Sequence, residues 1–142
     1  MAEDDVPAGP QIDVTAVSIE PDADFLPIEE QWKLGIFFSP DTALSGYHWR
    51  VTYVVDTSKR RMIVEVGATD KIDYAAGPNQ MEFLCPRFDV SGVPPDILAQ
   101  NNGMLTATLT GPDGEKPLAV NLVVKVEARD GMLVRKIFNP MD

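Results

Sequence analysis

The stretch His48–Val55, HWRVTYVV, decides the fold class. Every second residue from Trp49 to Val55 is large and apolar, and most of the residues between them are polar. This period of two places one apolar row on a single face of a β-strand. Similar rows recur along the chain, and no stretch shows the apolar stripe of a long helix. The sequence therefore predicts an all-β protein.

Turn residues separate these rows at a regular spacing, which is typical of a β-sandwich. The clearest hairpin joins residues 105–110 to 118–128 through Gly111-Pro112-Asp113-Gly114, a strong turn signal. Pro95–Gln100 predicts a single helical turn, because proline is tolerated at the first position of a helix. We expect an immunoglobulin-like β-sandwich of seven to eight or more mostly antiparallel strands. The expected strands lie at residues 12–19, 32–38, 48–55, 61–66, 81–85, 105–110, 118–128 and 132–138.

The alternation also predicts which way individual side chains point in the first three expected strands. In the first row, strict alternation predicts that Ile12 and Val14 face away from Val17 and Ile19. Single apolar residues in the next two strands, Phe37 and Val54, fall opposite the main apolar rows. Such residues indicate either a covered second face or a docking patch.

Length and composition indicate one globular domain. The chain has 142 residues, 44% of them apolar, and a single cysteine, Cys85. It contains no apolar run of eighteen residues and no secretory leader, so we expect an intracellular protein of the nucleus or cytoplasm. Residues 1–10 are expected to form a flexible acidic tail, and residues 11–142 a single immunoglobulin-like domain.

The formal net charge of −10 is concentrated at one end of the chain. Nine of the 22 acidic residues precede Lys33, the first basic residue. The other thirteen are nearly balanced by twelve lysines and arginines. Direct nucleic-acid binding is disfavoured, because it needs clustered cations. The acidic end either serves solubility or attracts a basic protein partner.

The inventory of reactive side chains favours a protein without enzyme activity. His48 is the only histidine and sits beside a core tryptophan, so a nucleophile would lack a base. Cys85 has no second thiol nearby in sequence and is expected to be buried. Pairs of loop carboxylates have no further ligands in a recognisable metal-binding loop. We expect no catalytic residues, no cofactor and no metal site.

The order of motifs resembles a known family. The segment IDVTAVSI is followed by WKLGIFF, WRVTYVV, a strand ending in VG, GPNQMEF, the loop VPPDIL, and a hairpin whose return strand contains VNLVV. In this order, over about Ile12 to Val126, the chain resembles the anti-silencing-function family of histone chaperones, which are small immunoglobulin-like domains. The resemblance implies an ATP-independent chaperone of a core-histone dimer. It would use a concave sheet face for one histone and strand addition for the tail of the other.

The resemblance places the binding surfaces on the hairpin of residues 105–109 and 118–126. The basic turn Lys59–Arg61 is a further candidate for partner binding, because it could contact acidic partners. The candidate partner-binding residues are Leu105, Ala107, Leu109, Ala119, Asn121 and Val123 on the hairpin, and Lys59, Arg60 and Arg61 in the turn.

The chain departs from the family at two places among these candidates, one in the hairpin and one in the basic turn. Ala119 stands where the family has an arginine on its histone-binding face. Lys59–Arg61 form a basic turn where the family has an acidic loop, and a basic turn does not attract a basic histone. The alternative is therefore a structural or adaptor subunit of a cytoskeletal or ciliary assembly, located in the axoneme. A third possibility is a lipid-carrying sandwich with an internal cavity.

Overall fold

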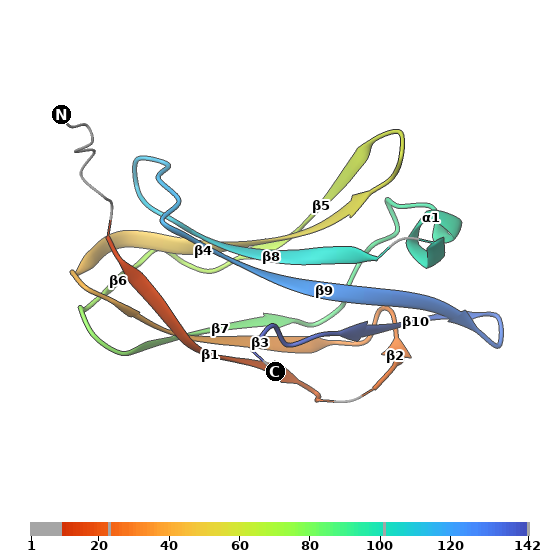
Figure 1. The fold of residues 1–142 in the computed structure, drawn as a ribbon, viewed down its shortest axis with the longest axis horizontal. Coiled ribbons are helices and arrows are strands. Elements are labelled where there is room, and N and C mark those ends of the chain that lie inside the picture. The colour runs from red at the N-terminus through yellow and green to blue at the C-terminus, as the bar shows by residue number, and fades with distance from the viewer. Residues whose placement is uncertain (1–9, 23, 101, 142) are drawn as a thin grey trace.

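The alternating rows become two packed β-sheets in the computed structural model, which describes residues 10–22, 24–100 and 102–141 (Figure 1). All strand pairs among these residues are antiparallel. The expected flexible tail lies outside the described residues, apart from Pro10. The elements are β1 (Ile12–Glu20), β2 (Leu26–Pro27), β3 (Trp32–Pro40), β4 (Leu44–Asp56), β5 (Arg61–Ala68), β6 (Ile72–Tyr74), β7 (Asn79–Cys85), α1 (Pro95–Gln100), β8 (Gly103–Thr110), β9 (Leu118–Arg129) and β10 (Met132–Ile137).

The all-β prediction is confirmed, and so is the single short helical turn. One sheet has three strands in the order β1-β3-β7. The other has seven strands along the path β2-β10-β9-β8-β4-β5, with β6 paired to the first half of β4. This division of the long strands is that of an immunoglobulin-like sandwich, extended at one edge by β10 and β2. The very short β2 and β6 were not predicted.

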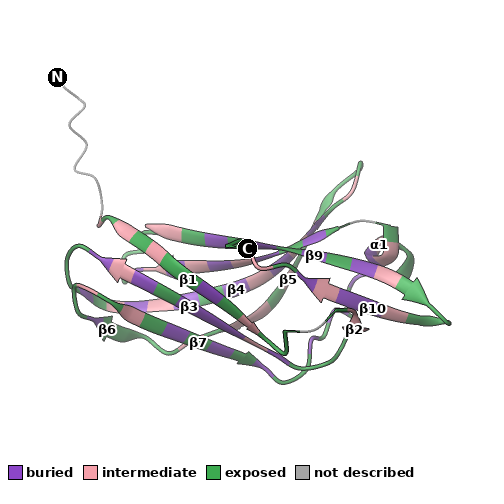
Figure 2. Cartoon of the chain, turned by 60° about the horizontal axis from the view of Figure 1, so that its bottom comes forward, coloured by how far each residue is buried: buried purple, intermediate pink, exposed green. Residues whose placement is uncertain are grey.

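The core lies between the sheets, and buried residues alternate with exposed ones along most strands (Figure 2). The predicted inward row of β4 is confirmed, since Trp49 and Tyr53 are fully buried. Aromatic rings from both layers meet edge to face: the centroids of Phe38 and Trp49 are 5.4 Å apart, and those of Tyr53 and Phe88 are 5.2 Å apart. Such pairs add specific geometry to the burial of apolar surface.

The first strand departs from strict alternation. The pairing of β1 with β3 shifts register between Val14 and Ala16, which marks a bulge. Beyond the bulge, Val17 lies in the core and Ile19 packs against it, on the same side as Ile12 and Val14. The prediction that these two pairs face opposite ways is therefore wrong. The bulge reverses the phase of the alternation and lets both halves of the strand face the core.

The start of β8 depends on a close approach between two strands. Gly103 pairs with Val55, and a Cβ atom on this glycine would lie 2.2 Å from the hydroxyl oxygen of Tyr53. The Tyr53 hydroxyl is buried and has no hydrogen-bond partner among the described residues. Burial raises the pKa of Tyr53 to about 12. Position 103 therefore requires glycine.

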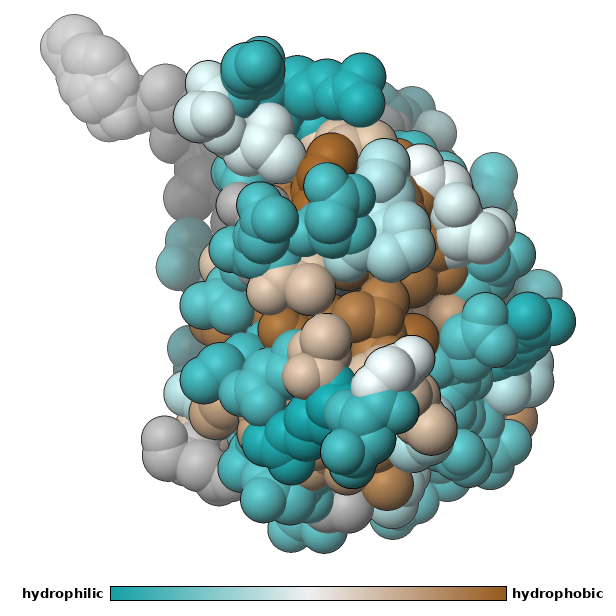
Figure 3. Space-filling view, turned by 90° about the vertical axis from the view of Figure 1, so that its right-hand side faces the viewer, coloured by the Kyte–Doolittle hydropathy of each residue, from teal (hydrophilic) through white to brown (hydrophobic). Residues whose placement is uncertain are grey.

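One end of the sandwich is covered by α1, which contacts β9. Its Leu98 side chain is buried, and Ile97 packs against the core. Figure 3 looks onto this end, where apolar side chains gather at the centre and polar ones surround them. Met62 and Val64, on the inner side of β5, are only partly buried.

Candidate partner-binding surface

The outer face of the seven-stranded sheet carries a row of apolar side chains that runs across the strands. Ile63 of β5 lies opposite Val54 of β4, which in turn lies opposite Met104 of β8. Met104 lies opposite Val123 of β9. Phe138, just beyond β10, extends the row, because its backbone N–H donates to the carbonyl of Val123 at 2.8 Å. These five residues are the transverse row.

The side chains of the transverse row are open to solvent. The exposed fractions are 59% for Ile63, 42% for Val123, 40% for Phe138 and 37% for Met104, and Val54 is partly buried between its neighbours. Because neighbouring strands are about 4.8 Å apart, five residues in register span roughly 20 Å. Single exposed apolar residues need no explanation, but a contiguous set is typical of a contact surface.

Charged pairs border the row on the β4–β5 side. The guanidinium of Arg50 donates two hydrogen bonds to the carboxylate of Glu65, one of them from Nε to Oε1 at 2.9 Å. Arg61 Nε donates to Asp56 Oδ1 at 2.8 Å. These hydrogen bonds hold the pKa values of Glu65 and Asp56 below their usual range. The charges near this part of the row therefore cancel in pairs.

On the β9 side, one carboxylate lies between two cations. Glu127 accepts a hydrogen bond from Arg129 Nε at 2.9 Å, and Lys125 Nζ lies 3.4 Å from its Oε2. The hydrogen bond from Arg129 is the main reason that the pKa of Glu127 lies below its usual range. The transverse row is thus apolar, with a polar border of nearly balanced charge. Core-and-rim arrangements of this kind are typical of protein interfaces.

A shallow hollow lies beside the row. Its volume is about 230 Å³, and its walls include Val54 and Ile63 of the row together with the Arg50–Glu65 pair. Thr108 of β8 and Lys116 of the β8–β9 turn complete the far side. The hollow could receive one or two side chains of a partner, which would extend the contact beyond the row itself.

The structure brings several of the predicted residues onto this face. Ala119, Asn121 and Val123 all point outward from β9, and Thr106 Oγ1 donates to Asn121 Oδ1 at 2.9 Å. Arg61 lies two residues from Ile63 on the same side of β5. Val123 and Arg61 therefore belong to one surface.

The other two residues of the basic turn lie at the tip of the β4–β5 hairpin. The backbone N–H groups of Lys59 and Arg60 donate to Thr57 Oγ1 at 3.2 and 3.0 Å. Both side chains are exposed, and within the described chain neither has a carboxylate partner. The positive charges of these two side chains lie next to this face, beyond the end of the sheet.

The remaining predicted residues cannot contribute side chains to a surface. Leu105, Ala107 and Leu109 are buried in the core, so their assignment to a partner-binding face is wrong. Alternation along β8 sends these residues inward and turns Met104 and Thr106 outward. The hairpin is also interior to the sheet, because β8 lies between β4 and β9, and β9 between β8 and β10. It therefore offers no free edge for strand addition.

Three members of the transverse row were missed from the sequence. Ile63 lies outward on a predicted strand, so alternation alone could have marked it as exposed. Met104 precedes the predicted strand 105–110, and Phe138 follows the end of β10. Their alignment into one row depends on the register between strands that are distant in sequence. No local pattern encodes that register.

The two side chains with catalytic potential, His48 and Cys85, lie on opposite sides of the seven-stranded sheet. His48 projects from the outer side of β4, whereas Cys85 is buried in the core and its thiol contacts the Arg87 carbonyl at 3.3 Å. Burial raises the pKa of the Cys85 thiol. No cluster of three His, Cys, Asp or Glu side chains suited to a metal occurs among the described residues. The one helix of the described chain, α1, has six residues, too few to cross a bilayer.

Comparisons with known proteins do not assign the chain to a family. No protein-family model matches the chain, and no curated protein matches it significantly. The resemblance to the anti-silencing-function chaperones stays a prediction.

Proposed function

We propose that the protein is a non-enzymatic protein-binding module that docks a partner on the outer face of its seven-stranded sheet. The transverse row is the observation that supports this function. Fully burying an apolar side chain of this size contributes about 1.5 to 3 kcal/mol, so a partner that covers even part of the row gains substantially. The balanced charges at its border would form the polar rim of the interface.

The charge pattern favours a partner with apolar contact residues over a strongly basic one. The carboxylates nearest the row, Glu65 and Asp56, are already paired with arginines of the same face. Lys59 and Arg60 at the hairpin tip would repel a basic protein. We therefore place the protein first as a structural or adaptor subunit of an intracellular assembly, such as a cytoskeletal or ciliary complex.

A histone-dimer chaperone of the nucleus is the second candidate. It is supported by the motif order and by the acidic N-terminal end, of which Asp13, Glu20, Asp22, Asp24, Glu29 and Glu30 belong to the described chain. Asp13 and Glu20 lie on β1, in the other sheet. Asp24 pairs with Lys136, whose ammonium lies over the ring of Phe138 at one end of the transverse row. A chaperone of this kind would have to combine the row with carboxylates of the other sheet.

A matched pair of variants tests the docking face. Val123→Asp places a charge in the transverse row, and Leu84→Asp places one on the outer face of the three-stranded sheet. Both residues are exposed on strands. Affinity-tagged protein in extracts of the cells that express it should retain a defined set of proteins. Val123→Asp should lose that set and Leu84→Asp should keep it; equal retention by both variants would contradict the proposal.

A titration with refolded histone dimers at physiological salt separates the two candidates. The adaptor function predicts no binding at micromolar concentration by the wild type. Tight binding that Val123→Asp abolishes would establish the chaperone instead. The variant Arg60→Glu plus Arg61→Glu controls for charge, because binding that appears only in this variant, or only at low salt, is nonspecific attraction.

A further inference from the structure

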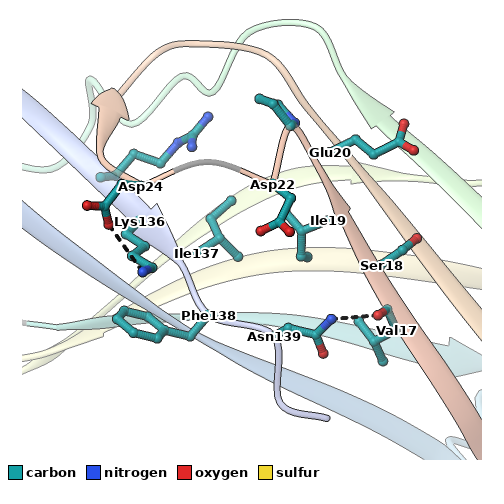
Figure 4. A pocket seen from close by; sticks show the side chains of 12 residues that line it. Val17, Ser18, Ile19, Glu20, Asp22, Asp24, Lys136, Ile137, Phe138 and Asn139 are labelled. Carbon is teal, nitrogen blue, oxygen red and sulfur yellow. Dashed lines mark hydrogen bonds and ion pairs between the residues drawn. The ribbon is translucent and has the colours of Figure 1, made fainter. Parts of the chain in front are cut away.

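A groove separates the two sheets along one side of the sandwich. It has a volume of about 860 Å³ and lies between β1 and the end of β10 (Figure 4). The strand β1 is an edge of the three-stranded sheet. On the other side, β2 covers only Val134 and Arg135 of β10, so no further strand of the described residues lies beside the end of β10. Two incompletely paired strand edges therefore face the groove.

Two polar contacts bridge the groove. Asn139 Nδ2 donates to the carbonyl of Val17 at 2.6 Å, and Lys136 Nζ lies 3.2 Å from Asp24 Oδ1 (Figure 4). The first contact shows that the backbone groups of Val17 point to the free side of β1. In an antiparallel strand the next residue but one has the same orientation, so Ile19 offers its N–H and carbonyl to the groove as well. An extended peptide is the ligand that uses such groups.

A buried cation lines this groove without a counter-charge in contact. Arg135 is 3% exposed, and its Nη2 donates to the Glu30 carbonyl at 2.6 Å. Among the described residues, its Nε has no hydrogen-bond partner, and no carboxylate lies within ion-pair distance. Burial lowers the pKa of Arg135, and the nearby Cys85 and Glu30 oppose that effect. A buried guanidinium with an unused N–H is costly, and a carboxylate satisfies it best.

The rim of the groove has the opposite charge. Glu20 and Asp22 are exposed, and neither has a cationic partner within the described residues. Asp24 is the one rim carboxylate that is paired, with Lys136. A small anion would be repelled by this rim, and a purely basic peptide would leave Arg135 unsatisfied. The site therefore combines a positive group inside with negative groups at its mouth.

We propose that the groove binds an extended peptide segment of a partner protein, in which one carboxylate side chain lies between basic residues. The carboxylate pairs with Arg135, and the basic residues pair with Glu20 and Asp22. The peptide backbone bonds to the free edge of β1. This site shares one residue, Phe138, with the transverse row, and it does not depend on the function proposed for the row.

Three capped seven-residue peptides test the proposal on the wild-type protein. The first has a central glutamate, a lysine at each end, and valine and threonine between them. The second replaces the glutamate by glutamine, and the third replaces both lysines by glutamate. We expect the first to bind and to shift the Nε–H resonance of Arg135 in a ¹⁵N–¹H spectrum. The second should bind about tenfold to a hundredfold more weakly, because hydrogen bonds to charged groups are the strong ones. The third should also bind more weakly.

Variants of the protein assign the two halves of the site. Arg135→Gln should remove the preference for glutamate over glutamine. Because Arg135 is buried, Arg135→Lys is a second test, which keeps the charge but loses the planar fork and should keep only part of the preference. Glu20→Gln plus Asp22→Asn, at exposed positions, should keep the glutamate preference and lose the lysine preference. Leu84→Asp, on the outer face of the three-stranded sheet, should leave peptide binding unchanged.

The proposal is overturned by any of three results. The first peptide does not bind at millimolar concentration, the glutamate and glutamine peptides bind the wild type equally, or binding leaves the Arg135 resonance unmoved. Loss of peptide binding in Leu84→Asp would instead locate the peptide outside the groove and also contradict this site.

Discussion

The outer faces of the two sheets expose large apolar residues of similar kinds but arrange them differently. On the three-stranded sheet, Phe37 lies opposite Gln80, and Leu84 lies opposite Lys33. Each apolar side chain there is separated from the next by polar neighbours. On the seven-stranded sheet, the members of the transverse row lie directly opposite one another. Register, more than composition, makes one face suited to a partner.

The difference also has a structural origin. The row is aligned because β4 pairs with β5 on one side and β8 on the other, with Val54 in register with both neighbours. That register depends on Gly103, which allows β8 to lie against the Tyr53 ring. The inner side of the sheet thus determines what its outer side presents. Changes on the inner side should cost stability, and changes on the outer side should cost binding.

The largest effect should come from breaking the register itself. Gly103→Ala puts a methyl group on the Tyr53 ring, and overpacking of this kind should lower the free energy of unfolding by about 2 to 3 kcal/mol in urea denaturation. Gly92→Ala is the control, because an added methyl group there meets no atom within 4 Å. Equal stability of the two variants would show that β8 does not depend on this close approach.

A second effect appears at high pH on the inner side of the same sheet. Tyr53 has a pKa of about 12 when folded, against 10.0 for an ordinary tyrosine, because burial disfavours the ionised form. The contribution of the neutral Tyr53 side chain to the free energy of unfolding is complete below pH 10. It is lost as the pH rises through 12, and the loss is about 2 kcal/mol at pH 12.

The comparison that isolates this effect is with Tyr53→Phe. The hydroxyl has no hydrogen-bond partner, so the variant should match the wild type near neutral pH. Above pH 10 it should become the more stable of the two in urea denaturation, since only the wild type must keep a buried tyrosine neutral. Parallel curves over this range would contradict a buried, unpartnered hydroxyl.

The smallest effect on stability should come from the outer faces. Val123→Asp and Leu84→Asp each change an exposed residue, so the free energy of unfolding should fall by about 0.5 kcal/mol or less in both, as measured in urea. Their difference should appear only in partner binding. A large loss of stability in Val123→Asp alone would mean that the row supports the fold and is not a free surface.

The sequence predicts the elements well and their lateral arrangement poorly. Alternation marked Trp49 to Val55 as an inward row, because a period of two is a local property of one strand. It failed at β1, where a bulge between Val14 and Ala16 changes the phase without any turn residue to signal it. Bulges and register are properties of strand pairs.

The candidate site shows the same limit. Val123 and Arg61 were predicted and lie on the proposed face, whereas Leu105 and Ala107 were assigned to it although alternation sends them inward. The sequence does not predict that Arg135 is buried, since its burial follows from the position of β10 at the edge of the groove. The neighbouring sequence does not reveal that Arg135 lies out of contact with every carboxylate of the described chain.

Site-specific photo-crosslinking tests the docking face most directly. A photoreactive phenylalanine analogue is placed at position 104, in the transverse row, or at position 84, on the opposite face, and extracts of expressing cells are irradiated. The proposed function predicts discrete adducts of defined mass from position 104 and none from position 84. Adducts of the same pattern from both positions, or none from position 104, would contradict the assignment of the outer face of the seven-stranded sheet as the partner-binding surface.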